Sequence, residues 1–116
     1  KGSIREQLFK TLIEQTPDAV VVLTDKKIEY VNNAGLKLLG INSLDEILGE
    51  PINNILSVEF VDLLLANIDE ASKSNKKINP LKVKLKTENN TIDAEIFGTV
   101  IEFQQQKIVQ LVIRQV

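Results

Sequence analysis

The chain has 116 residues, 43% of them hydrophobic, which suits one domain built around a single core. Its formal charge of −2 comes from 14 basic and 16 acidic residues spread along the sequence, so there is no basic stripe for a nucleic-acid backbone. No apolar run approaches the roughly 20 residues that cross a bilayer, and the N-terminus has no signal-peptide pattern. We therefore expect a soluble segment that contacts neither nucleic acid nor membrane directly.

Several reactive residue types are missing. Cysteine, histidine and methionine are absent, which removes thiolate nucleophiles, imidazole bases and the ordinary axial ligands of haem. An enzyme would need a carboxylate pair or an activated serine, and Asp18, Asp25 and Asp93 fall in expected turns or exposed faces without a visible mate. We expect no catalytic activity and no metal here. Because no methionine starts it, we also expect the chain to be a segment of a longer protein.

An amphipathic helix is predicted at the N-terminus. Ile4, Leu8 and Leu12 recur at helical spacing among charged residues, and the pattern stops before Pro17. A helix of about 13 residues is marginal alone in water, so its apolar side needs a docking surface. We therefore divide the chain into a helix over residues 1–17 and a core domain from residue 18 to residue 116.

A hairpin and a short helix are expected next. Residues 19–23 form an apolar, β-branched run, residues 24–27 form a turn, and residues 28–31 alternate as a second strand. Asn32 can accept free backbone N–H groups at the start of a helix of about two turns. Gly40 can end that helix in a left-handed conformation.

The middle of the chain is predicted to be helical. Residues 43–49 resemble a short helix with Ser43 as N-cap and Glu46 completing a capping box. Residues 51–56 suit one more helical turn. From residue 58 to residue 72, apolar residues repeat at intervals of three and four, which predicts the longest helix after the first.

Three strands complete the pattern. Leu81, Val83 and Leu85 alternate with lysines, as in a half-buried strand. Two further strands, at about 91–103 and 107–116, are joined by a glutamine turn and are apolar on both faces. Because an open antiparallel sheet in water does not tolerate two bare apolar faces, something must cover each side. The order of elements predicts an α+β fold with a five-stranded antiparallel sheet, short helices on one face and the N-terminal helix available for the other.

Over nearly the whole chain these segments resemble the PAS family of sensor domains. Residues 16–25 are similar to its first strand, and residues 28–34 followed by 38–40 are similar to its motif of a strand ending in Asn, an Ala and a helix closing on Gly. Residues 49–52 resemble its next short helix, and residues 113–115 the approach to its terminal Asp-x-Thr linker. The resemblance implies a PAS-like fold and a sensory role.

The sequence departs from the family pattern in two ways, one in the terminal linker and one in the residues that would bind a cofactor. Gln115 stands where the family often has Asp, and the sequence stops at Val116 before the Thr could appear, so we expect that coupling through the linker cannot be inspected. The flavin-binding photosensors need a Cys and haem-binding members usually offer His, and both residues are absent. We expect no cofactor, and a pocket that is empty, water-filled or occupied by a small apolar ligand held without a covalent bond.

Strand alternation combined with the resemblance places a hypothetical pocket between the sheet and the helices. Its lining would be almost wholly apolar, which suits a small hydrophobic ligand, whereas an organic acid would require an inward Arg or Lys. The same residues can equally be ordinary core packed without a cavity. The expected lining residues are Val20, Val22, Ile28, Tyr30, Leu36, Leu39, Phe60, Leu64, Ala94 and Ile96. Asn32 is expected to cap a helix and not to bind a ligand.

A homodimer is also predicted. In the family, the equivalent of the N-terminal helix packs on the outer face of the sheet or against its mate in a second subunit. A monomer with this helix folded onto its own sheet is the competing outcome. The expected interface residues are Ile4, Leu8, Leu12, Val21, Leu23, Phe97, Ile101 and Phe103.

Two functions are compatible with these features. The first is a sensory or regulatory input domain of a larger signalling protein, such as a histidine kinase of a two-component system, acting through a small ligand, a dimer or both on its own output domain. The second is a ligand-free dimerisation or protein-interaction module of the same fold. On resemblance alone we expect a cytoplasmic location, in a parent protein that can itself be membrane-anchored.

Overall fold

The computed structural model describes residues 4–116, apart from the side chains of Arg5 and Phe103. Three helices and five strands follow one another with two short 3-10 turns, η1 and η2. In chain order they are α1 (Ile4–Gln15), β1 (Ala19–Thr24), β2 (Lys27–Val31), α2 (Asn33–Leu39), η1 (Leu44–Glu46), η2 (Ile52–Asn54), α3 (Val58–Lys73), β3 (Lys77–Lys86), β4 (Thr91–Phe103) and β5 (Gln106–Gln115).

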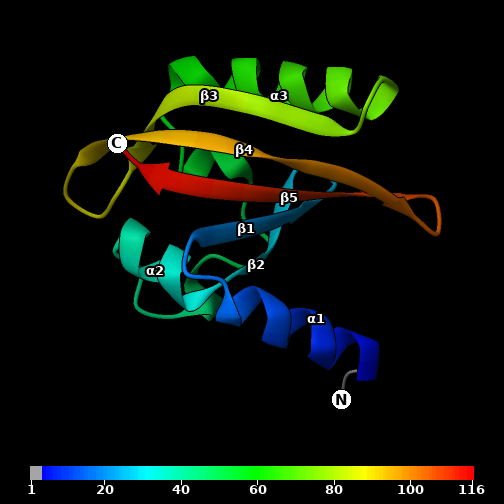
Figure 1. Cartoon of the computed structure of the whole chain (residues 1–116). Helices are drawn as coiled ribbons and strands as arrows, with labels where there is room; N and C mark the ends of the chain where they lie inside the picture. Colours follow the sequence, from blue (N-terminus) through cyan, green and yellow to red (C-terminus); the bar gives the residue numbers. More distant parts are fainter. Residues whose placement is uncertain (1–3) are drawn as a thin grey trace.

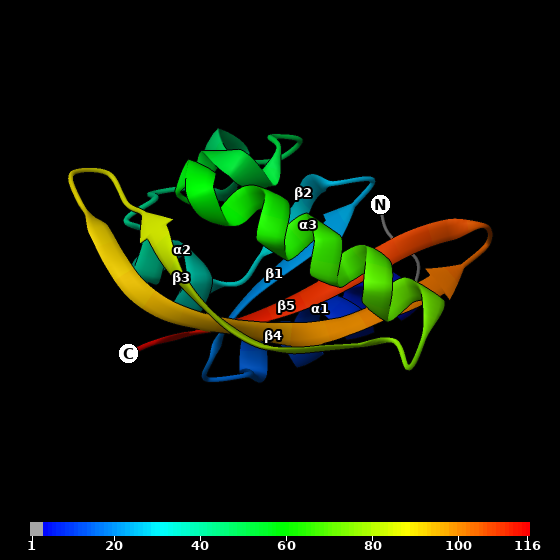
Figure 2. The ribbon, with the colours of Figure 1, turned by 90° about the horizontal axis from the view of Figure 1, so that it is seen from above.

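The five strands form one antiparallel sheet in the order β2-β1-β5-β4-β3 (Figure 1). The first and last strands of the chain therefore lie side by side in its centre. Helix α3 runs across one face, and α1 lies on the opposite side of the sheet (Figure 2). We call the face under α3 the inner face and the face under α1 the outer face. The predicted fold class is confirmed.

The inner face carries the main hydrophobic core. Residues from every strand meet residues from α2, α3 and the two 3-10 turns in one cluster, in which Leu39 and Leu64 are almost fully buried. The helices supply what an apolar sheet face needs, namely a water-excluding cover. No helix among the described residues is long and apolar enough to span a membrane.

The predicted faces of the first hairpin are wrong except at Ile28. Val20, Val22 and Tyr30 were expected on the inner face, but they lie in the small outer cluster with Ile13. Val21 and Leu23, expected to lie on the outer face, point into the main core. Because β1 is apolar on both sides, its alternation could separate the two sets of residues without showing which set meets the helices.

A bulge in β2 explains why Ile28 and Tyr30 lie on different faces. Val22 pairs with Tyr30 and Leu23 pairs with Ile28, so Glu29 is an extra residue in the second strand. The bulge turns Ile28 inward, as predicted, and Tyr30 outward. Strict alternation could not anticipate this change, because a bulge moves every later side chain to the other face.

Two element boundaries also differ from the prediction. The helix expected over residues 43–49 is only the 3-10 turn η1, and the Ser43 hydroxyl accepts from the Asp45 N–H at 3.1 Å. Strand β3 begins at Lys77, earlier than expected, because the ladder continues through an irregularity between Ile78 and Leu81 that accommodates Pro80.

Candidate functional site

Helix α1 is attached to the sheet by its last turn. Ile13 is buried against Val20 and Val22 on the outer face. The Glu14 carboxylate accepts a hydrogen bond from the Tyr30 hydroxyl and, at 2.9 Å, another from the Asn33 N–H. Burial, and then the hydrogen bond and charge of Glu14, raise the pKa of Tyr30 to about 12. Ile13 and Glu14 therefore help to attach the helix to the domain, and the Lys10 ammonium lies 5.7 Å from the centre of the Tyr30 ring.

Asn32 connects this attachment to the core. Its side-chain oxygen accepts from the backbone N–H groups of Val20 and Gly35, each at 2.9 Å. Its amide nitrogen donates to the carbonyls of Ile13 and Asp18, each at 3.0 Å. The side chain is fully buried and all of its hydrogen-bonding capacity is used. The predicted helix cap is confirmed, and the same residue joins the end of α1, the start of β1 and the start of α2.

The remainder of α1 presents an exposed apolar stripe, which we define as Ile4, Leu8 and Leu12. These residues are four apart and so share one side of the helix. Their exposed fractions are 83%, 57% and 57%, whereas Ile13 is 4% exposed. The side of α1 that meets the sheet is thus different from the side that carries the stripe.

The other predicted interface residues are divided between the two faces. Ile101 lies on β4 with 43% of its surface exposed, and Phe97 is half-buried beneath the Arg114 guanidinium, 5.0 Å from the ring centre. Val21 and Leu23 are in the inner core and unavailable to a second subunit. The side chain of Phe103 lies outside the described residues.

The predicted pocket lining is distributed in a similar way. Leu39, Leu64, Ala94 and Ile96 are at most 1% exposed in the main core, with Leu36 and Phe60 packed against them. These side chains pack closely, as ordinary core residues do. Their role in ligand binding stays a prediction.

A cleft of about 290 Å³ opens elsewhere, between α3 and the sheet. Its apolar floor is formed by side chains of β1, β5 and the second half of α3, and charged residues of the β1–β2 turn, α3 and β5 stand at its rim. The lining residues are Leu23, Asp25, Lys26, Leu65, Ile68, Asp69, Lys107 and Val109. None of the ten residues predicted to line a pocket is among them. The one sequence signal was a lysine two residues before buried Val109, and only the topology places it in the same cleft as Lys26.

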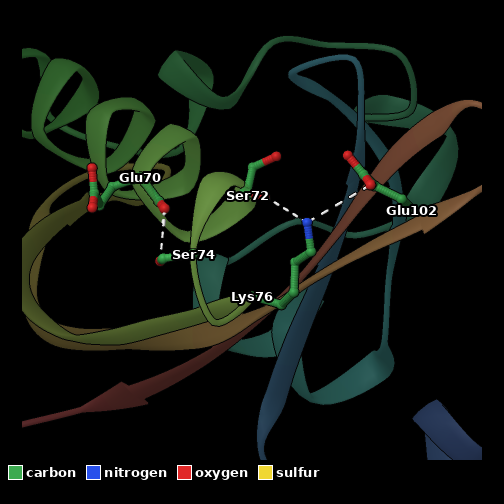
Figure 3. Close-up of polar contacts among 5 residues, drawn as sticks. All are labelled: Glu70, Ser72, Ser74, Lys76 and Glu102. Carbon is green, nitrogen blue, oxygen red and sulfur yellow. Dashed lines mark hydrogen bonds and ion pairs between the residues drawn. The ribbon is translucent and has the colours of Figure 1, made fainter.

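Lys76 contacts the end of α3 through its side chain (Figure 3). The Lys76 backbone is left-handed, with a φ of 66°, and its ammonium donates to the Ser72 carbonyl at 2.5 Å. The same ammonium lies 3.7 Å from the Glu102 carboxylate of β4. A cation at the C-terminus of a helix stabilises the unpaired carbonyls there. Lys76 thereby connects α3 to β4.

The three aspartates considered for catalysis have different surroundings. Asp18 pairs with Arg114 at 3.3 Å, and Asp93 pairs with Lys84 at 2.6 Å. That hydrogen bond, followed by the charge of Asp93, raises the pKa of Lys84. Asp25 lies at the rim of the cleft in the turn between β1 and β2. Two of the three are therefore surface ion-pair partners.

Comparison with known families gives a match over residues 7–76 to a model described as PAS domain. This match spans more than half of the chain. The chain belongs to the PAS domain family. A search of curated proteins found no match.

Solved PAS domains share this fold over nearly their whole length. A PAS domain from a two-component sensor histidine kinase has a TM-score of 0.77 at 19% identity, with 97% of each chain covered. The PAS domain of a protein from Colwellia psychrerythraea has a TM-score of 0.80 at 18% identity, with 98% of each covered. That of nitrogen regulation protein NR(II) from Vibrio parahaemolyticus gives 0.73 at 18%, covering 99% of this chain and 100% of that one. At these identities the likeness shows the fold.

The PAS assignment is consistent with the residues at the site. A PAS domain is a sensory module and not itself a catalyst, and this one has no cysteine with which to form a flavin adduct. Its two notable surfaces are the stripe on α1 and the cleft beneath α3. The stripe is exposed and apolar, and the cleft is concave with charged groups at its rim.

Proposed function

We propose that this PAS domain is the signal-input part of a longer cytoplasmic signalling protein, such as a histidine kinase, and that it works as a homodimer paired through α1. The observation that carries the proposal is the exposed stripe of Ile4, Leu8 and Leu12 on a helix whose one buried apolar side chain among the described residues is Ile13, in its last turn. A helix of this length is marginal unless its apolar side is covered. A second copy of α1 offers a matching stripe.

Self-association is favoured by the symmetry of such a contact. Pairing across a two-fold axis applies the same patch twice, so one stripe is sufficient to build the whole interface. Exposed Ile101 and the half-buried ring of Phe97 are available on the outer face to extend the contact. The predicted interface is thereby reduced to α1 and β4, since Val21 and Leu23 are committed to the core.

Signal transfer would follow from the way in which α1 is attached. Asn32 and Glu14 connect the end of α1 to β1, β2 and α2 through direct hydrogen bonds. A change of packing in the core can therefore shift the angle of α1 and the geometry of the pair, and a dimer with two such arrangements is what an output domain can read. The small-ligand part of the function is assigned to the cleft under α3.

Native mass spectrometry at several protein concentrations tests the pairing. We expect a concentration-dependent mass of two chains for the wild-type protein and a single chain for Leu8→Glu, with the dissociation constant raised at least about tenfold. Val58→Glu is the matched control, because Val58 is 77% exposed on α3, on the other face of the sheet. It should leave the dimer intact.

Both substitutions are at exposed positions, so the monomer fold should survive and circular dichroism can verify it. A wild-type protein that is monomeric at every concentration would refute the dimer. Equal weakening by Leu8→Glu and Val58→Glu would also refute it. A dimer that retains no small molecule and responds to none would favour the alternative function, a ligand-free interaction module of the same fold.

A further inference from the structure

We propose that the cleft beneath α3 binds a small amphiphilic monoanion, of the chemical class of a medium-chain aliphatic carboxylate. This inference rests on the proposed sensory function and names the ligand of that function. It differs from the apolar ligand expected from the sequence, because the structure brings two lysines to the rim of the cleft.

The floor of the cleft suits a short hydrocarbon chain. Leu23 and Val109 come from the adjacent strands β1 and β5, and Leu65 and Ile68 come from one side of α3. The volume of about 290 Å³ corresponds to roughly ten waters in the liquid. It lies at the lower end of the range for small-molecule pockets. An aliphatic chain with a compact head group fills such a space, whereas a nucleotide or a flavin is too large for it.

The rim supplies two lysines without ion pairs among the described residues. Lys26 is in the β1–β2 turn, where both turn residues are left-handed, with φ values of 53° for Asp25 and 68° for Lys26. Lys107 is near the start of β5, two residues before buried Val109, so it shares the inner face. The two lysines therefore line the same cleft from different parts of the fold, Lys26 from the β1–β2 turn and Lys107 from β5.

Two carboxylates at or beside the rim form ion pairs with other lysines. Asp69 at the rim pairs with Lys73 at 3.2 Å. Glu102, the residue opposite Lys107 in the ladder, pairs with Lys76 at 3.7 Å (Figure 3). Asp25 is the remaining rim carboxylate and has no ion pair among the described residues.

When the Asp69–Lys73 ion pair is counted as neutral, the other charged residues of the rim have a net charge of one positive unit. Lys26 and Lys107 together contribute two positive charges, and Asp25 contributes one negative charge. A monoanion balances this charge when it lies between the two lysines. A neutral alkyl ligand leaves the charge uncompensated and an alkylamine increases it, so the head group of the ligand is decided by charge and its tail by the apolar floor.

Nuclear magnetic resonance titration of the 116-residue chain with octanoate tests the proposal. We expect saturable shifts of the methyl signals of Leu23, Leu65, Ile68 and Val109. Octan-1-ol has the same tail without the charge, and octylamine reverses the charge. Octanoate should bind at least about fivefold more tightly than octanol, and octylamine should bind more weakly than octanol.

Two sets of variants separate the head group from the tail. Lys26→Gln combined with Lys107→Gln should lower octanoate affinity to the level of octanol. Leu65→Trp should fill the cleft and abolish binding of both compounds. Leu63→Trp is the matched control on the same helix, because Leu63 is 44% exposed and lies outside the cleft, and it should bind octanoate as the wild-type protein does.

Three results would overturn the proposal: equal affinities for octanoate and octanol, shifts spread over other surfaces, or an unchanged affinity after loss of both lysines. The dimer experiment is independent of these results, since it depends on α1 and not on the cleft. A dimer that does not bind octanoate removes the ligand assignment alone. A monomer that binds octanoate through the cleft removes the dimer alone.

Discussion

Helix α3 crosses the inner face of the sheet and α1 lies on the opposite side (Figure 2), where Ile13 of its last turn is its one described side chain in the buried outer cluster. Among the described residues, 22 are buried in the inner cluster and three in the outer one. Stability therefore resides mainly on the inner side. The outer side retains exposed apolar surface, which does not stabilise a monomer and is available for association. Substitutions on the two faces should differ in size and in kind.

The largest effect is expected where the inner strands approach most closely. A Cβ atom at Gly98 of β4 would lie 2.0 Å from the backbone carbonyl oxygen of Gln110 in β5. The obstacle is backbone in the centre of the sheet, so β4 and β5 must separate to admit a methyl group. Gly98→Ala should lower the free energy of unfolding by at least about 3 kcal/mol, measured by urea denaturation. A loss below about 1 kcal/mol would show that the central ladder is more adaptable than the inner core implies.

A smaller but still large effect is expected where the two faces are joined. Asn32→Ala removes the side-chain acceptor of the buried Val20 and Gly35 N–H groups and one donor from each of the Ile13 and Asp18 carbonyls, of which the Ile13 carbonyl keeps the Thr16 N–H. We expect a loss of about 3 kcal/mol in the free energy of unfolding, because each unpaired buried polar group is costly. Asn33→Ala is the neighbouring control, since the Asn33 side chain is exposed and only its backbone N–H contacts Glu14. A comparable loss in both variants would contradict the special position of Asn32.

An intermediate and local effect is expected on the outer face. Ile13→Ala should cost about 2 kcal/mol or less, because the site is at an open edge and can partly collapse. The kind of change is more informative than its size. Hydrogen exchange should show that α1 amides lose protection while β1 and β5 retain theirs, as expected for a separate unit of low stability. Uniform loss of protection throughout the domain would mean that α1 and the sheet unfold together.

The smallest effect concerns the Tyr30 hydroxyl, which belongs to the only tyrosine of the chain. Its pKa is raised from 10.0 to about 12 by burial first and by Glu14 second. The folded protein thus favours the neutral phenol. This contribution to stability is fully present below pH 10 and is lost as the pH rises through about 12. Alkaline absorbance titration should place the tyrosinate midpoint near 12 for the native chain.

Glu14→Gln sharpens this test, because glutamine keeps the size of the side chain and removes its charge. The midpoint should fall toward 10, though not reach it, since burial of the ring remains. A native midpoint already at 10 would show that Glu14 does not hold Tyr30 in solution. It would also contradict the proposed attachment through which α1 responds to the core.

Much of this fold could be predicted from the sequence. Helical spacing in α1 and α3, the cap residues Asn32 and Gly40, and alternation in the last strands identified their elements, because these signals are local. The short 3-10 turn at Leu44–Glu46 was overpredicted as a helix, since a capping pattern marks where a helix can begin and does not fix its length.

The candidate site was less accessible to sequence reasoning. Lys26 and Lys107 are separated by most of the chain and meet because β1 and β5 are neighbours in the sheet. Neither residue differs in its local pattern from the other lysines of the surface. The expected pocket residues were instead selected by alternation, which identifies buried side chains and does not show where packing leaves space.

The sequence by itself determined the family, the number of strands and their order along the chain, and the need for a cover on each side of the sheet. These features follow from composition, caps and periodicity, which depend on neighbouring residues. Only the tertiary structure decided which side of β1 faces α3, because both sides are apolar and a bulge at Glu29 interrupts the alternation of β2. The structure likewise decided that α1 leaves its stripe exposed and that two distant lysines share one cleft, because these features depend on how separate segments pack together.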